Sequence, residues 1–317
     1  MGTFFLSLQL VSPVFLLIFI GAFLKKIKII DDNFVKLSSK LVFNVALPVF
    51  IFFNVSVFNL ETSFDYKQII FVIGCTISAY FLGWISAKIL SLCSFQKGVF
   101  IQGAFRGNFA IVGLAIISAY FSDEIMGKSS VLLAVIVPLY NILSLIALLS
   151  NNRKDKITLF SLLKEILKNP LIISIAVAIP FSMNKIEITK PIQETGNYIA
   201  DLTLPLALLS IGGTLNFSQI KKVSGAAVSA SILKTMIFPF IFTYLSYILG
   251  YRNEELGMLF ILFSAPTAIV SFIMANALGG DEKLAGNIIM MTTLLSVITM
   301  PLGIFFMEIA GLINLTG

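Results

Sequence analysis

The chain has 317 residues, of which 58% are hydrophobic and only 12% are charged, and its mean hydropathy is +0.99. Soluble domains carry about 25% charged residues, so this composition excludes an ordinary soluble protein. The absence of histidine excludes Ser-His-Asp catalysis and histidine metal ligation. Two cysteines form no disulfide framework, and no metal or cofactor site is expected. The formal charge of +6 gives no reason to expect a nucleic-acid partner, since the placement of the basic residues matters more than their sum.

Apolar segments follow one another along the whole chain. A helix that spans a bilayer needs about 20 mostly apolar residues. Ten segments approach or exceed this length: 6–24, 34–58, 68–91, 97–121, 129–150, 170–184, 191–215, 223–249, 254–277 and 284–313. They are continuously apolar and do not alternate, which excludes an outer-membrane barrel. The predicted fold class is an all-α polytopic membrane protein with ten transmembrane helices.

The second half of the chain repeats the first. Residues 44–48, Asn-Val-Ala-Leu-Pro, return as 201–205, Asp-Leu-Thr-Leu-Pro, and the Ala-Ile-Val of 110–112 returns at 268–270. Five segments per half would place the two copies in opposite orientations, as in secondary transporters. The predicted domains are a first five-helix repeat (1–150), a cytoplasmic linker with an interfacial helix (151–169) and a second, inverted repeat (170–317).

Basic residues are distributed unequally between the two sides of this arrangement. Of the 22 Lys and Arg residues, 15 fall on one side and five on the other. Cytoplasmic loops carry the Lys/Arg excess. We therefore predict a multi-pass protein of the cytoplasmic membrane, with residues 151–169 inside and both termini outside the cytoplasm.

The fourth and ninth segments each contain polar residues and helix breakers near their middle. Residues 102–108 read Gln-Gly-Ala-Phe-Arg-Gly-Asn, and residues 264–267 read Ser-Ala-Pro-Thr. We expect both helices to break there, near Gly107 and Pro266, and to cross. Paired breaks in corresponding segments are the best sequence indication of a transport site. Pro48 and Pro205 are the corresponding hinge candidates of the second and seventh segments.

Charged residues within the segments are costly and need partners. Arg106 either binds carbonyl groups of the broken helices or contributes its guanidinium to an anionic substrate, and the sequence favours neither. Asp201 has two open roles. It either forms an ion pair with Lys234, or its carboxylate titrates and couples transport to protons. Asn141 either lines the transport site as a polar residue or forms a hydrogen bond between helices.

An ordered series of motifs resembles the auxin efflux carrier family in its compact bacterial form. The matching stretches are residues 41–44 with Pro48, 105–108 with Gly113, 137–138 with 140–141, 168–170, 204–208 with 212–213, 265–267, and 293–296 with Pro301. The resemblance implies the ten-helix fold of the bile-acid sodium symporters, with segments 1, 2, 6 and 7 as a scaffold. Segments 3–5 and 8–10 would form a mobile domain that moves like an elevator, often in a homodimer that forms through the scaffold.

The family's substrates are organic anions. Plant members have proline where this chain has Gly107 and Ala115, and many have a long cytoplasmic loop that is absent here. Auxin itself is therefore not the expected substrate. We predict a secondary transporter, not an enzyme, that moves a small carboxylate across the lipid bilayer, with efflux favoured. The candidate site residues are Arg106, Asn108, Asn141, Pro266 and Thr267 on the mobile side, and Asn44, Pro48, Asp201 and Pro205 on the scaffold side.

Three alternatives remain open. A sodium- or proton-coupled importer of the same fold could draw sodium ligands from Asn108, Asn141, Ser264, Thr267 and Ser296. A ligand sensor without transport would differ only in a flux assay. An intramembrane enzyme lacks histidine, paired carboxylates within the segments and a cluster of metal ligands.

Overall fold

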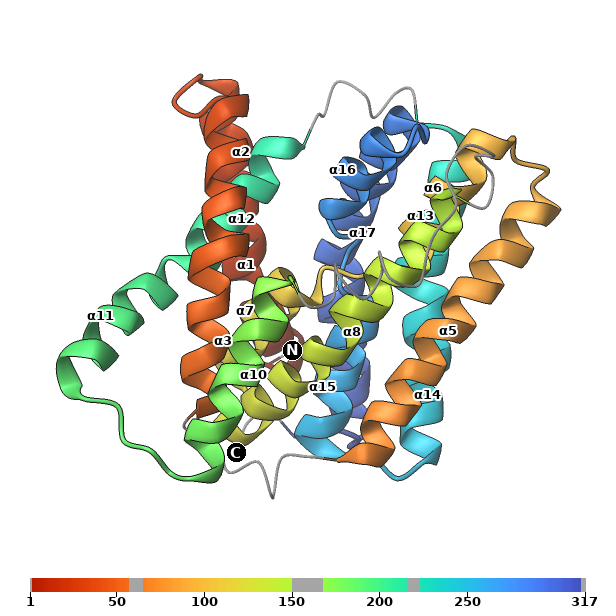
Figure 1. Ribbon diagram of the computed structural model, residues 1–317. Coiled ribbons are helices and arrows are strands. Elements are labelled where there is room, and N and C mark those ends of the chain that lie inside the picture. The colour runs from red at the N-terminus through yellow and green to blue at the C-terminus, as the bar shows by residue number, and fades with distance from the viewer. Residues whose placement is uncertain (1, 57–64, 150–167, 216–222, 315–317) are drawn as a thin grey trace.

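The computed structural model describes residues 2–56, 65–149, 168–215 and 223–314, and these ranges are helical without any β-strand (Figure 1). The first half contains α1 (Gly2–Lys26), α2 (Asp32–Leu41), the π-helix η1 (Val42–Ala46), α3 (Leu47–Ser56), α5 (Tyr66–Ile89), α6 (Ser94–Phe105), the π-helix η2 (Phe109–Gly113), α7 (Leu114–Tyr120) and α8 (Asp123–Leu149). The second half contains α10 (Pro170–Met183), α11 (Lys190–Asp201), α12 (Thr203–Thr214), α13 (Gly225–Ile232), the π-helix η4 (Leu233–Ile237), α14 (Phe238–Ile248), α15 (Asn253–Ser264), α16 (Val270–Ala277) and α17 (Glu282–Ile309).

Every one of the ten predicted segments contains helix. Among the described residues, five helical stretches are long and apolar enough to cross a membrane: Asp32–Ser56, Tyr66–Ile89, Asp123–Leu149, Gly225–Ile248 and Glu282–Ile309. Phe109–Tyr120 and Pro170–Met183 are shorter apolar helices. The multi-pass membrane class is thus confirmed. The number of ten spans, the inverted orientation of the halves, the domain borders and the positions of the termini stay predictions. The predicted interfacial helix of the linker lies almost wholly outside the described residues.

Contacts at the connections between helices define two ends of the bundle. At one end the backbone N–H of Asp281 donates to the carbonyl of Phe95, and the Gln96 amide donates to the Asp281 carboxylate. At the other end Ser122 donates to Glu254, and Lys128 forms ion pairs with Glu124 and Glu255. These contacts place residues 95 and 96 beside the start of α17, and the start of α8 beside the start of α15.

Prolines explain two of the three π-helical turns among the described residues. A proline has no N–H and cannot continue the regular hydrogen-bond ladder. Just before Pro48, the N–H of Leu47 bonds to the carbonyl of Val42, five residues back, and Phe238 makes the same bond to Leu233 just before Pro239. The helix from Asp32 to Ser56 is therefore continuous through Pro48. Near Pro205 the chain does break, at Leu202 between α11 and α12. Whether either proline acts as a hinge stays a prediction.

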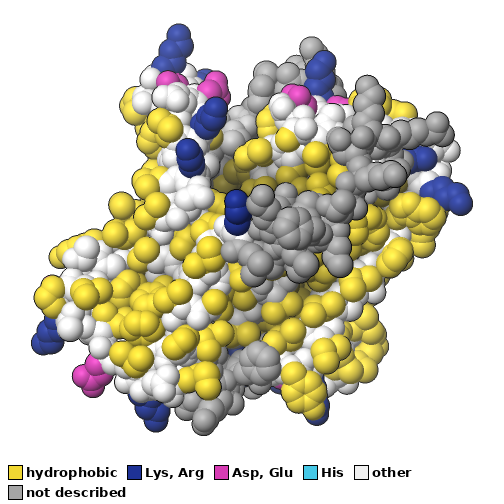
Figure 2. Space-filling model, in the orientation of Figure 1, with side chains coloured by type: hydrophobic (Ala, Val, Ile, Leu, Met, Phe, Trp, Pro, Cys, Tyr) yellow, Lys and Arg dark blue, Asp and Glu magenta, His cyan; other side chains and the backbone are white. Residues whose placement is uncertain are grey.

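Helices α1 and α12 approach each other so closely that glycine is required at their contact. A Cβ on Gly212 would lie 1.9 Å from the Ile18 carbonyl oxygen, and one on Gly21 would lie 2.2 Å from that of Leu209. Small residues at such contacts are typical of membrane helix pairs. On the face shown in Figure 2, hydrophobic side chains cover most of the middle, and charged side chains lie mainly towards the two ends. This distribution fits a protein embedded in a bilayer.

Candidate functional site: two broken helices that cross

The fourth and ninth predicted helices are both interrupted, and the interruptions touch. Helix α6 ends at Phe105 and helix α15 ends at Ser264. Gly107 and Thr267 form an isolated antiparallel bridge. The N–H of Asn108 donates to the Pro266 carbonyl at 2.7 Å, and that of Ala268 donates to the Arg106 carbonyl at 3.2 Å. The predicted crossing of two broken helices is therefore confirmed at the predicted residues.

Different residues cause the two breaks. Pro266 cannot donate to the α15 ladder, and it disfavours helical geometry in Ala265, whose backbone is extended (φ −52°, ψ 133°). No proline is present at the first break. There Arg106 is extended (φ −80°, ψ 101°), and the Arg106 carbonyl and the Asn108 N–H bond to the ninth helix instead of to their own.

Further hydrogen bonds connect the two bridge residues and their neighbours to the surrounding helices. The Thr267 N–H donates to Thr292 Oγ1 of α17 at 3.1 Å, and the Thr267 hydroxyl donates to the Gly103 carbonyl at 2.7 Å. The Arg106 side chain donates to Asn141 Oδ1 of α8 at 2.8 Å. The crossing is thus tied to both long helices beside it, which gives it a fixed geometry.

Arg106 lies at the centre of a buried polar cluster. Its side chain is 5% exposed. Nη2 donates to Asn141 Oδ1 at 2.8 Å, and Nη1 lies 3.1 Å from both Ser144 Oγ and Met274 Sδ. All three partners are neutral, and no Asp or Glu among the described residues forms an ion pair with Arg106. A buried guanidinium with only neutral partners keeps its attraction for an anion.

Lys234 contacts the second break, at the end of α15. It is 3% exposed, and its ammonium donates to the Phe263 carbonyl at 2.7 Å, at the C-terminal end of α15. Carbonyl groups at a helix C-terminus carry partial negative charge, so a cation is favoured there. Asp201 is exposed and forms no ion pair with Lys234 in the described part of the chain, so the predicted pairing of these two charges is wrong.

The scaffold candidates do not join the cluster. Asn44 is exposed, and its side-chain amide donates to the Lys40 carbonyl. Pro205 is also exposed, and Pro48 accepts a hydrogen bond from Ser174 of α10. A role for Asn44 and Asp201 in binding stays a prediction. Asn108, by contrast, is 6% exposed and lies in the crossing itself.

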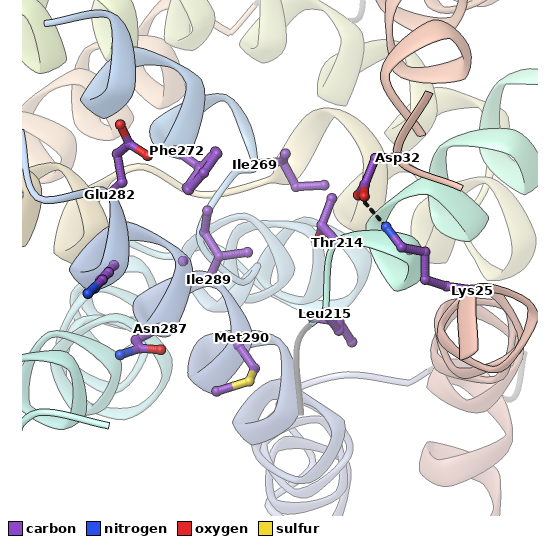
Figure 3. A pocket seen from close by; sticks show the side chains of 13 residues that line it. Lys25, Asp32, Thr214, Leu215, Ile269, Phe272, Glu282, Asn287, Ile289 and Met290 are labelled. Atoms are coloured by element: carbon purple, nitrogen blue, oxygen red, sulfur yellow. Dashed lines mark hydrogen bonds and ion pairs between the residues drawn. The ribbon is translucent and has the colours of Figure 1, made fainter. Parts of the chain in front are cut away.

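A cavity of about 660 Å³ opens beside the crossing (Figure 3). Its walls come from α1, α2 and α12 on one side and from α16 and α17 on the other. The lining residues are Lys25, Asp32, Gly213, Thr214, Leu215, Ile269, Phe272, Glu282, Lys283, Gly286, Asn287, Ile289 and Met290. Ile269 follows Ala268 of the crossing directly. Arg106 and Asn108 do not line the cavity. The cavity therefore ends beside the crossing, and these two residues of the crossing are not exposed to it.

Sequence reasoning missed several residues of this region. Ser144 lies three residues after Asn141 and therefore on the same face of α8, which is a signal that could have found it. Met274 and Thr292 carry no such signal, because their partners lie more than twenty residues away in the sequence. Lys283 and Asn287 were not singled out either, although they line the cavity.

Comparison with known proteins shows the family of this chain. The family described as membrane transport protein matches residues 6–304. The chain belongs to this family. The match confirms the resemblance to the auxin efflux carrier family and identifies the protein as a membrane transporter and not an enzyme.

Individual relatives are distant. An uncharacterized transporter of Methanocaldococcus jannaschii is 24% identical over 315 residues, which cover 94% of this chain and 97% of the relative. An uncharacterized transporter of Methanothermobacter thermautotrophicus is 22% identical, over 93% and 97% of the two chains. A putative malonate transporter of Rhizobium meliloti is 25% identical over 163 residues, about half of each chain.

Proposed function

We propose that this transporter moves a small organic anion, a carboxylate, and that the anion binds at the crossing of the broken helices. The observation that carries the proposal is the state of Arg106, a buried cation that has three neutral partners and no carboxylate partner among the described residues. A guanidinium presents a planar fork of donors that matches a carboxylate. Asn108 and Thr267 add polar groups at the same place.

An elevator-like movement fits the position of the cavity. The cavity lies between α1, α2 and α12 on one side and α16 and α17 on the other, although α1 also packs directly against α17. The crossing is tied by hydrogen bonds to α8 and α17. We infer that the crossing moves together with these helices relative to the α1–α12 body. Such a movement would expose the now buried Arg106 to one side of the membrane and then to the other. A homodimer through the scaffold stays part of this proposal.

The Lys234 ammonium favours a carrier without sodium coupling. It lies against the carbonyl end of α15, where an alkali cation would otherwise find oxygen ligands. The predicted sodium ligands Asn141, Thr267 and Ser296 form other hydrogen bonds. Each net negative charge that leaves a cell gains about 2.3 kcal/mol per 100 mV of inside-negative potential, so efflux needs no coupling ion.

Flux measurements in proteoliposomes test this proposal. Uptake of radiolabelled malonate, malate, succinate and indole-acetate would be measured under an imposed potential of either sign, in sodium or in choline buffer. We expect at least one of these acids to move, in the direction that the potential favours, at equal rates in the two buffers. Protein-free liposomes are the control. No flux of any of the four acids would contradict the proposal, and flux only with sodium would replace it with the coupled importer.

A further inference from the structure

The mouth of the cavity carries a second polar site on α17, one that the crossing does not include. Lys283 and Asn287 are four residues apart, so they lie on the same face of the helix, and both line the cavity. Gly286 also lines the cavity, and the nearest atoms to a Cβ at this position would be those of the Phe272 ring at 3.9 Å. We propose that Lys283 and Asn287 form a loading subsite that binds the carboxylate of the transported anion before it reaches the crossing. This inference rests on the proposed function.

The charges of the cavity assign this role to Lys283 and not to Lys25. Lys25 forms an ion pair with Asp32 on the opposite wall, so its charge is already balanced (Figure 3). Lys283 is exposed, lines the cavity and forms no ion pair with any Asp or Glu of the described residues. Glu282 also lines the cavity, and its carboxylate would repel an anion. Removing the charge of Lys283 and removing the charge of Glu282 should therefore change anion binding in opposite directions.

The distance along α17 makes this subsite separate from the crossing. Thr292, which binds the Thr267 N–H, lies nine residues after Lys283. At 1.5 Å per residue this is roughly 14 Å of helix, which is too long for a small dicarboxylate to bridge. Met290 and Ile289 line the cavity between the two places. An anion would thus leave Lys283 before it contacts the crossing.

The first experiment compares the kinetics of four variants in inverted and right-side-out membrane vesicles, with malonate as the first probe and the other three acids as further probes. Lys283→Gln should raise KM by about twofold to fivefold, the effect expected of one exposed charge pair. The increase should shrink at high salt, because screening weakens interactions between exposed charges. Lys283→Arg should behave like the wild type, and Glu282→Gln should lower KM. Lys36→Gln is the matched control, since Lys36 is exposed on α2 and does not line the cavity.

The outcomes separate the two proposals. If the wild type moves one of the acids, and Lys283→Gln and Lys36→Gln have the same KM on both sides of the membrane, the loading subsite is wrong while the proposed function stands. If the wild type moves none of the four acids, the proposed function fails and the subsite fails with it.

Chemical labelling gives a readout that does not depend on flux. Cys93 is exposed and would be replaced by serine, whereas Cys75 is buried. In this background Asn287→Cys should react with an impermeant thiol reagent from one side of the membrane, and the transported acid should slow the reaction. Lys36→Cys should react at the same rate with and without the acid. Equal rates for Asn287→Cys with and without the acid would overturn the proposal.

Discussion

The two broken helices make similar backbone contacts but use different cations. Arg106 lies within the first break and reaches outward to side chains of α8 and α16. Lys234 comes from η4 and reaches a main-chain carbonyl at the end of α15. A flat guanidinium can exchange neutral side-chain acceptors for a carboxylate, whereas a single ammonium on a helix C-terminus stabilises that terminus. In the proposed function, the first break recognises the substrate and the second supports the geometry of the crossing.

The largest expected effect concerns Arg106. Arg106→Gln should weaken carboxylate binding about tenfold to a hundredfold, because a charge-assisted hydrogen bond contributes about 1.5–3 kcal/mol. Arg106→Lys should lose less, since it keeps the charge but not the fork. Isothermal titration with a transported acid measures both. Ser144→Ala, which removes one acceptor and leaves the cation, is the control and should bind nearly normally. Stable Arg106→Gln protein with wild-type affinity would refute the role in recognition.

Lys234 should show the opposite pattern. Lys234→Ala leaves the Phe263 carbonyl without its partner, and this should lower the free energy of unfolding by about 1–3 kcal/mol. Folded protein should still bind the acid. Thermal unfolding in sodium chloride and in choline chloride of equal ionic strength would be compared, and only the variant should gain stability from sodium. Equal unfolding temperatures of variant and wild type would show that Lys234 does not support the break.

A smaller effect is expected at the bridge. Thr267→Val removes the hydroxyl that bonds to the Gly103 carbonyl, and the loss should be about 1 kcal/mol of unfolding free energy. Thr293→Val is the matched control, because the Thr293 hydroxyl bonds only to Ile289 of its own helix. Thermal unfolding of the two variants should differ. If both lose the same stability, the contact between the broken helices contributes little.

The smallest effect is expected at Gly107. A Cβ there would lie 3.1 Å from Lys234 Nζ, the movable end of a long side chain. Gly107→Ala should therefore cost less than about 1 kcal/mol. Gly212→Ala places its Cβ 1.9 Å from a main-chain oxygen, which cannot move without its helix, and should cost clearly more. Unfolding temperatures that rank the two variants the other way would contradict this assignment of tight and loose contacts.

The sequence predicted the breaks because their causes are local. Pro266 removes a donor and restricts the residue before it, and polar residues in an apolar segment must face protein or water. The same reasoning singled out Arg106 and Asn141, which the structure brings together. It failed for Asp201 and Lys234, because two in-span charges in one half need not share a helix face or a depth.

The sequence by itself determined the membrane class, the helical content and the places where two helices break, since composition, segment length and proline act over a few residues. Only the tertiary structure decided which groups satisfy each cation. Ser144, Met274 and the Phe263 carbonyl come from other elements, and their choice depends on how those helices pack. The cavity has the same origin, because Lys25 and Lys283 line it from opposite ends of the chain.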